Sequence, residues 1–512
     1  MSRRPLLAIC IAVFAIALVG LLARGSGESK LPLPAQRAVR AALSDPVVHK
    51  QLAAHGYDHT RTVALDSTLA RVTFFDGPRV RVVAAVDAHG VVQHAQVYAP
   101  GSPQYGSKLS DAPWLLGLFA LGFLLATVTL PLLSLRNVDV LALLGFTVPI
   151  LLGDRQLLEA SVLSGYVPLA YLCGRLVHRA TRAEAPKPAT PVYELLAPKL
   201  PRLTAYAIAA AAALLAIVAI SSPGAIDVGF ASTAGATLLL HGTLPYGHMP
   251  SDVLHGDTYP LLNYVLYLPA AAVAPVRDSF DDTSSAVLVA FAAALVVAVA
   301  LRRSGPRGVL AWLCFPPLAV AVASGTNDVL LAAAIALALA LAARGGRSAL
   351  VLAAGAWIKL APLALLPIWL ARTSGRPLIR AVTAVAGLSA ALCAWIIVLG
   401  GPAGVGHMLH AISFQFERGT LQSAWTLLGL GPAQQVAQAA TIALVAWGTL
   451  NARRIATEPA RLAAVSGAVL AALQLSAGNW SYLYAVWLFP CAALALIAGR
   501  TVASEKGASQ AR

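Results

Sequence analysis

Residues 203–222 read LTAYAIAAAAALLAIVAISS, twenty positions without a charged side chain. About 20 apolar residues in a helix are enough to cross the hydrocarbon core of a bilayer. Comparable stretches recur near 114–134, 138–153, 157–177, 259–276, 284–301, 308–323, 328–343, 349–371, 381–400, 433–450, 462–476 and 482–499. This recurrence predicts an all-α polytopic membrane protein.

The composition supports the same class of protein. Of the 512 residues, 58% are hydrophobic and 12% are charged, whereas about a quarter of the residues of a soluble domain are charged. The mean hydropathy is +0.74. Because the net charge of +15 is spread over loops between apolar segments, we interpret it through membrane topology rather than through nucleic-acid binding.

The chain before the first long apolar stretch divides in two. Residues 1–24 combine a basic start with an apolar run and predict an N-terminal transmembrane anchor, with a signal peptide as the alternative. Residues 25–113 are polar, and we expect a small extracytoplasmic α+β domain. Helical spacing covers 34–55, and the alternation typical of strands covers 70–75, 79–86 and 91–98.

The rest of the chain is predicted to be mostly membrane-embedded. Three transmembrane helices are expected in 114–177, and 178–202 is a basic, proline-rich cytoplasmic linker. Residues 203–499 form one membrane module, followed by a cytoplasmic tail at 500–512.

Loop charges constrain how the module crosses the membrane. If 259–276 and 349–371 both crossed fully, the arginines near 302–307 and 344–347 would fall outside, against the positive-inside preference. Both segments contain prolines, so we expect re-entrant elements there and about 12 full crossings. This topology places most carboxylates of the module outside: Asp227, Asp252, Asp257, Asp278, Asp281, Asp282, Asp328 and Glu417.

The loop between residues 221 and 259 is the first candidate site. Asp227 directly follows an apolar helix and shares the loop with Asp257 and three histidines. Such polar crowding against an apolar body favours a binding site. The alternative is that Asp227 only caps a helix.

Lys359 is the second candidate, because it is a cation deep inside an apolar stretch. An ammonium group in that position needs an anion to offset its desolvation. A bound phosphate would supply one. The alternatives are snorkelling to the interface and an ion pair with Asp328.

Two further polar segments stand out. In 406–425, Arg418 is suited to bidentate phosphate binding, and the neighbouring candidates are His410, Glu417 and Gln422. A plain surface ion pair between Glu417 and Arg418 is the alternative. In 479–484, Trp480 and Tyr482 form either an aromatic belt or a sugar-stacking wall.

The sequence lacks the motifs that are typical of several kinds of enzyme chemistry. The chain has no Walker-type loop, GxGxxG, HExxH or nucleophile elbow, and its five cysteines all lie in apolar runs. No cofactor is indicated. We interpret the three histidines of 49–59 as solvated, and a divalent metal stays an alternative without a motif of its own.

The order of these pieces resembles the GT-C class of membrane glycosyltransferases, especially the bacterial polyprenyl-phosphate-mannose-dependent α-mannosyltransferases and related arabinosyltransferases. The resemblance covers about 203–499 and is carried by short pieces in order: Asp227, 242–246 (GTLPY), 259–262 (YPLL), 325–328 (GTND), Lys359 with Pro362, and 418–425 (RGTLQSAW). Tyr259 departs from the more usual double proline, and Thr326 stands where glutamine is common.

The resemblance implies transfer of mannose, or alternatively arabinose, from a polyprenyl-phosphate donor to a lipid or glycan acceptor on the outer face of a bacterial plasma membrane. Asp227 would be the general base of an inverting reaction, and Lys359 and Arg418 would bind the donor phosphate. Asp257, Tyr259 and Asp328 would contact substrate, with His410, Glu417, Gln422, Trp480 and Tyr482. A lipid or glycan transporter or flippase, and a non-catalytic envelope scaffold, are the competing hypotheses.

Overall fold

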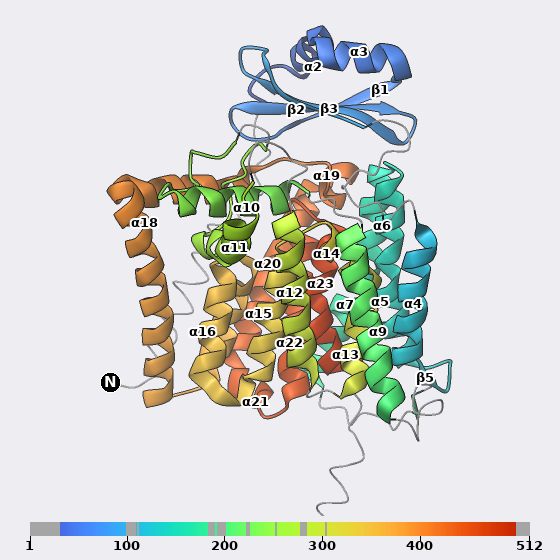
Figure 1. Ribbon diagram of the computed structural model, residues 1–512, viewed down its shortest axis with the longest axis vertical. Helices are drawn as coiled ribbons and strands as arrows, with labels where there is room; N and C mark the ends of the chain where they lie inside the picture. Colours follow the sequence, from blue (N-terminus) through green and yellow to red (C-terminus); the bar gives the residue numbers. More distant parts are fainter. Residues whose placement is uncertain are drawn as a thin grey trace, which may run out of the picture.

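The computed structural model describes residues 31–98, 109, 112–182, 190–191, 201–221, 226–250, 253–276, 284–302 and 305–497. The predicted N-terminal anchor, cytoplasmic tail, most of the linker, and Asp252, Asp278, Asp281 and Asp282 lie outside these ranges. An N-terminal α+β domain rests on one end of a body of packed helices (Figure 1).

The N-terminal domain contains two helices and an antiparallel meander. The helices are α2 (Ala35–Ser44) and α3 (Pro46–His55), and the strands, in the order β1-β2-β3-β4, are β1 (His59–Ala64), β2 (Leu69–Asp76), β3 (Arg79–Asp87) and β4 (Val92–Val97). The predicted helix over 34–55 is broken because the Asp45 carboxylate accepts the N–H groups of Val47 and Val48 and restarts the helix. Strand β1 was not predicted.

The two faces of this sheet have different partners. Successive strand residues point to opposite faces, so Val72 and Phe74 of β2 pack in one hydrophobic cluster with residues of α2 and α3. Leu69 and Phe75 point the other way and pack with hydrophobic residues of the helical body. The sheet therefore lies between its own helices and the body.

Polar contacts fix this docking. Arg61 forms a 2.9 Å ion pair with Glu159, and the His255 Nε2 lies 2.9 Å from Oδ2 of Asp66. The Gly419 N–H donates to the Ala64 carbonyl oxygen at 3.0 Å. A Cβ atom at position 419 would lie 2.2 Å from that oxygen, so this approach requires glycine.

The helical body contains the helices from α4 to α23, numbered in chain order. The helices are α4 (Pro113–Thr127), α5 (Leu135–Gly145), α6 (Thr147–Asp154), α7 (Leu158–Thr181), α9 (Pro201–Ser221), α10 (Asp227–Leu240), α11 (Leu261–Val273), α12 (Ser284–Leu301), α13 (Pro306–Leu313), α14 (Pro316–Ala323), α15 (Asp328–Ala340), α16 (Gly345–Ala356), α17 (Leu366–Ala371), α18 (Arg376–Glu417), α19 (Ala424–Leu428), α20 (Gly431–Leu450), α21 (Ala452–Ile455), α22 (Pro459–Ser476) and α23 (Ala485–Ala492).

Several of these helices are compatible with a membrane. In the described part of the chain, five are long and apolar enough to cross a bilayer, or seven if each of two bent pairs is one span. Other predicted spans, such as α4 and α12, are apolar but shorter. The molecule is therefore mostly helical and membrane-compatible, and the figure of about 12 crossings stays a prediction.

Several helix breaks shape the body. Helix α16 ends at Ala356, and the chain then forms a short 3₁₀ turn, Ala361–Leu365, and α17, both of which pack back against α16. The segment 349–371 therefore doubles back, whereas α11 is a single helix despite Pro269. Helix α15 is bent by 75° from the helix that follows it. Helix α18 kinks at Gly401, and its second arm crosses the end of the body beneath the N-terminal domain (Figure 1).

Candidate functional site

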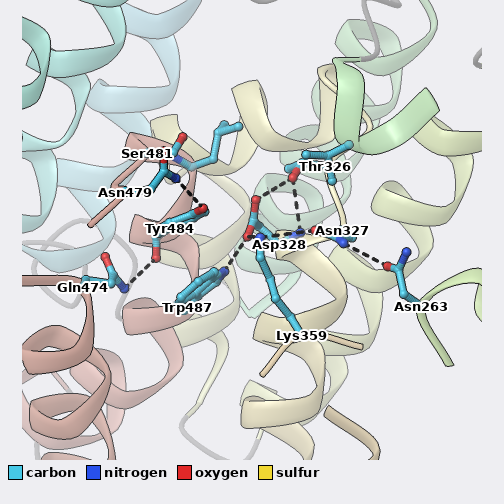
Figure 2. Close-up of polar contacts among 12 residues, drawn as sticks. Asn263, Thr326, Asn327, Asp328, Lys359, Gln474, Asn479, Ser481, Tyr484 and Trp487 are labelled. Carbon is cyan, nitrogen blue, oxygen red and sulfur yellow. Dashed lines mark hydrogen bonds and ion pairs between the residues drawn. The ribbon is translucent and has the colours of Figure 1, made fainter. Parts of the chain in front are cut away.

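A buried ion pair lies inside the helical body. The Lys359 Nζ is 2.5 Å from Oδ1 of Asp328, and the two side chains are 14% and 2% exposed. Lys359 follows the end of α16, and Asp328 begins α15 (Figure 2). Of the alternatives for Lys359, the ion pair with Asp328 is confirmed. The outer side predicted for Asp328 stays a prediction, since the structure shows only that its carboxylate is buried against this lysine.

Asp328 has further hydrogen-bond donors around it. The Trp487 Nε1–H donates to Oδ1 at 2.9 Å, and the Thr326 hydroxyl donates to Oδ2 at 2.6 Å. Lys359 also lies 4.6 Å from the Tyr484 ring centroid and 5.0 Å from that of Trp487. Buried charges are stable only when such partners replace water, so the network offsets the cost of burial.

A second layer of amides extends this network. Asn327 donates through Nδ2 to the Asn263 Oδ1 at 2.9 Å (Figure 2), and Asn263 donates to the Ser232 hydroxyl at 2.9 Å. The chain of bonds therefore links the turn before α15 to α11 and α10. Asn263 and Trp487 were missed in the sequence because each is an ordinary polar or aromatic residue within an apolar helix.

Beside the ion pair lies a cavity of about 210 Å³, the cation pocket. Its lining includes Lys359, Arg418, Tyr259, Gln438, Gln474 and Asn479. Two predicted phosphate ligands and one predicted substrate contact thus come together from the residue that follows α18, the turn after α16 and the turn before α11. The pocket also has apolar walls, including Leu360 and Leu363.

Of the two cations that line the pocket, Arg418 has fewer polar partners than Lys359. Its Nε is buried without a hydrogen-bond partner, and within the described residues its guanidinium group forms no ion pair. Lys359, in contrast, is paired with Asp328. The side chain of Glu417 lies outside the described residues. Arg418 is therefore the group in this pocket that is best placed to receive an anion.

Asp227 is the first residue of α10 and does not line the cation pocket. The interpretation as a helix cap is wrong, since the cap position is Ile226 and the Asp227 carboxylate accepts the next N–H, that of Val228. The Ile226 N–H donates to the Ser324 carbonyl at 3.1 Å. This bond holds the first turn of α10 against the turn that leads to Asp328.

Charges from three directions act on Asp227. Desolvation by the protein around the Asp227 carboxyl raises its pKa, and the hydrogen bond from the Val228 N–H opposes this rise. The positive charges of Arg418, Arg71 and Lys359 oppose this rise in the pKa. A carboxylate coupled to several cations beside a pocket is the arrangement expected of a functional group.

Arg71 is a third residue that sequence reasoning missed. It lies on β2, on the sheet face that it shares with Leu69 and Phe75, and this face is turned toward the helical body. The strand alternation could have placed Arg71 on that face. Only the docking of the N-terminal domain shows that the sheet face with Arg71 is on the side of Asp227.

A second cavity of about 490 Å³ lies between the N-terminal domain and the body; we term it the polar cavity. Its lining includes Asp66, Asp257, His255 and His410. The Asp257 Oδ2 accepts the Gly247 N–H at 2.9 Å. Among the described residues, no group of three or more His, Cys, Asp or Glu side chains is arranged to hold a metal ion.

The two cavities share a wall. Asp257 lines the polar cavity, and the next residues, Thr258 and Tyr259, line the cation pocket. In the same way Phe414 faces the polar cavity and Gln415 the cation pocket. The Gln415 amide donates to the Thr258 hydroxyl at 2.7 Å, so the two layers of the wall are joined.

The remaining predicted residues lie elsewhere. Trp480 is 1% exposed, packs beside Tyr166 and fills the space in front of Gly165. Tyr482 is also buried, and Gln422 accepts the Trp480 N–H through its backbone carbonyl. None of the three lines either cavity. The sugar-stacking and substrate-binding roles expected of them find no support in this arrangement, since the rings pack in the core.

Comparisons of the chain with models of protein families, with curated proteins and with solved structures gave no match. The function is therefore argued from the site itself.

Proposed function

We propose that the protein is an integral membrane glycosyltransferase that moves a sugar, mannose or alternatively arabinose, from a polyprenyl-phosphate donor to an acceptor on the extracytoplasmic side of a bacterial plasma membrane. The observation that carries the proposal is the partly apolar pocket lined by Arg418, a cation without an ion pair among the described residues, whose positive charge also acts on the Asp227 carboxylate. A phosphate and a reacting hydroxyl need groups of these two kinds.

The chemistry follows from the two groups. Asp227 accepts the proton of the acceptor hydroxyl as its oxygen attacks the anomeric carbon, and the bond from that carbon to the phosphate oxygen breaks. The electron pair leaves with the polyprenyl phosphate, whose negative charge Arg418 stabilises. Configuration at the anomeric carbon is inverted. Protonation of the leaving group is unnecessary because it departs as an anion.

Lys359 has a different task in this scheme. Its charge is already balanced by Asp328. Lys359 therefore adds to the electrostatic potential of the pocket and holds Asp328 in place, and it is not a free cation for the phosphate. The apolar lining at Leu360 and Leu363 suits the first units of a lipid chain, and the amides of Gln438, Gln474 and Asn479 suit sugar hydroxyls.

The test uses the full-length protein in membranes, with radiolabelled polyprenyl-phosphate mannose and, separately, the arabinose donor. We expect Asp227→Asn to reduce transfer by about 10²-fold or more, because a general base contributes about 10²- to 10⁴-fold. Glu458→Gln, at the start of α22, is the matched control and should transfer normally. Transfer that survives Asp227→Asn would overturn the proposed base.

The buried Lys359–Asp328 pair beside a helix break also favours a second function, lipid or glycan transport, because transporters place ion pairs and broken helices in their core. Proteoliposomes that move labelled polyprenyl-phosphate mannose across the bilayer without forming a glycoside would support transport over transfer.

A further inference from the structure

The polar cavity joins two parts of the chain that the proposed reaction does not otherwise connect. The Asp66–Thr68 turn of the N-terminal domain forms one side, and Asp257, His410 and Ser413 of the helical body form the other. We infer that this cavity binds the acceptor, and that the acceptor is a neutral oligosaccharide. The acceptor role rests on the proposed function.

Size and free polar groups suit such a ligand. A volume of about 490 Å³ falls within the range of about 300–1,000 Å³ that is typical of small-molecule sites. Within the described part of the chain, the imidazoles of His407 and His410 form no hydrogen bond, and Asp257 leaves its Oδ1 without a donor. Sugar hydroxyls both donate and accept, so they can satisfy all three.

The lining also argues against other ligands. Asp66 and Asp257 both face the cavity, which disfavours an anion. The apolar chain of a lipid finds less hydrophobic lining here than beside Leu360 and Leu363 in the cation pocket. A neutral ligand rich in hydroxyl groups fits best.

The cavity is held open by fixed contacts. His255 has a φ of 56°, which is uncommon for a residue other than glycine. Its ring stacks on Phe414 at 3.8 Å, and its Nε2 reaches Asp66 at 2.9 Å. The histidine therefore ties the turn of the N-terminal domain to α18, and the site exists before a ligand arrives.

A shared wall separates this site from the donor side. A ligand beside Asp257 is separated from the cation pocket by the layer that contains Thr258 and Gln415. A sugar chain bound in the polar cavity therefore has to extend past this layer for its reacting hydroxyl to reach the donor and Asp227. The N-terminal domain, on this inference, selects the acceptor.

The experiment blocks the cavity from the side of the N-terminal domain. Ser67 is exposed, lines the cavity, and forms no side-chain hydrogen bond within the described residues. Ser67→Trp fills the space, and Ser67→Ala is the matched control that leaves it open. Purified full-length protein in nanodiscs is dialysed to equilibrium against tritiated mannotriose and, separately, arabinotriose, and the thermal unfolding of each variant is recorded.

We expect Ser67→Trp to weaken binding of one of these sugars by about tenfold or more, and Ser67→Ala to change it by less than about twofold. Asp257→Asn, which keeps an acceptor for the Gly247 N–H, should also weaken binding. Equal binding by the wild type and Ser67→Trp, or no binding of either sugar by the wild type, would overturn the inference.

The outcome is separable from that of the proposed function. Asp227→Asn should bind the oligosaccharide like the wild type, because Asp227 does not line this cavity. Oligosaccharide binding that depends on Ser67 in a protein without transfer activity would overturn the transferase and keep the sugar site. Transfer that is insensitive to Ser67→Trp would overturn the acceptor site and keep the transferase.

Discussion

Lys359 and Asp328 are 31 residues apart in sequence, yet their charged atoms lie 2.5 Å apart in the interior of the helical body. The pair joins the turn after α16 to the start of α15, at the point where the segment 349–371 doubles back. Lys359, which the sequence predicted as a ligand for the donor phosphate, is therefore already ion-paired with Asp328. Arg418 becomes the main candidate for the phosphate.

Removing one member of the pair should strongly destabilise the protein. Lys359→Met leaves the Asp328 carboxylate buried without its counter-charge, and loss of one partner of a buried pair costs about 3–5 kcal/mol. The Lys359→Met/Asp328→Asn double variant removes both charges and should unfold less easily than the sum of the two single effects predicts. Chemical denaturation in detergent measures the three free energies of unfolding. Simple additivity would contradict the pairing.

Arg418 should govern the affinity for the donor. A hydrogen bond to a charged group contributes about 1.5–3 kcal/mol, so Arg418→Gln should raise the donor KM by about 10- to 150-fold. Arg418→Lys keeps the charge but loses the planar guanidinium group, so its donor KM should lie between those of the wild type and Arg418→Gln. Initial rates of mannosyl transfer against donor concentration provide the measurement. An unchanged donor KM in Arg418→Gln would mean that another group binds the phosphate.

Arg71 should control the pH dependence of transfer. Its positive charge lowers the pKa of Asp227, and a general base acts only when deprotonated. Arg71→Gln should therefore raise the pKa of Asp227 and move the acidic limb of the rate profile to higher pH. Arg79→Gln is the control, because Arg79 is an exposed residue on the neighbouring strand. Identical acidic limbs in the wild type and Arg71→Gln would exclude this coupling.

Gly419→Ala should displace the N-terminal domain. The added Cβ would meet the Ala64 carbonyl oxygen at 2.2 Å, whereas a Cβ at Gly406 on α18 meets open space. We expect faster proteolysis at the domain junction in Gly419→Ala and wild-type rates in Gly406→Ala. Transfer should fall together with the docking, since Arg71 moves away from Asp227. Unaltered proteolysis of Gly419→Ala would show that the domain does not need this contact.

Acid should loosen the same junction through Asp66. Partial burial raises the pKa of this carboxyl, but hydrogen bonds from His255, Thr68 and Leu69 outweigh it and lower the pKa to about 2. A depressed pKa stabilises docking above the ordinary value near 3.8, and this contribution is lost as the pH falls toward 2. Hydrogen exchange of β1 and β2 between pH 5 and pH 2, corrected for intrinsic rates, measures it. In Asp66→Asn, the hydrogen exchange of β1 and β2 should not speed up between pH 5 and pH 2.

Part of the fold could be predicted from the sequence because its causes are local. Apolar segments such as 203–222 mark helices, and alternation over 70–75 marks a strand, since each pattern follows from the period of its own backbone. Strand β1 was missed because His59–Ala64 is mostly polar or only half-buried and takes its place by pairing with β2. The break at Asp45 depends on a side chain that caps the next helix, and such boundaries are weak signals.

The sequence by itself determined that the molecule is mostly helical with apolar helices compatible with a membrane. It also identified three of the polar residues around the cation pocket, Lys359, Arg418 and Tyr259, because a charged or polar side chain in an apolar chain is conspicuous wherever it lies. Only the tertiary structure decided their partners. It paired Lys359 with Asp328, buried Trp480 in the core, and brought Arg71 of the N-terminal domain within electrostatic reach of Asp227. The reason is physical: burial and Coulomb energy depend on distance in space, and helix breaks and sheet docking set that distance.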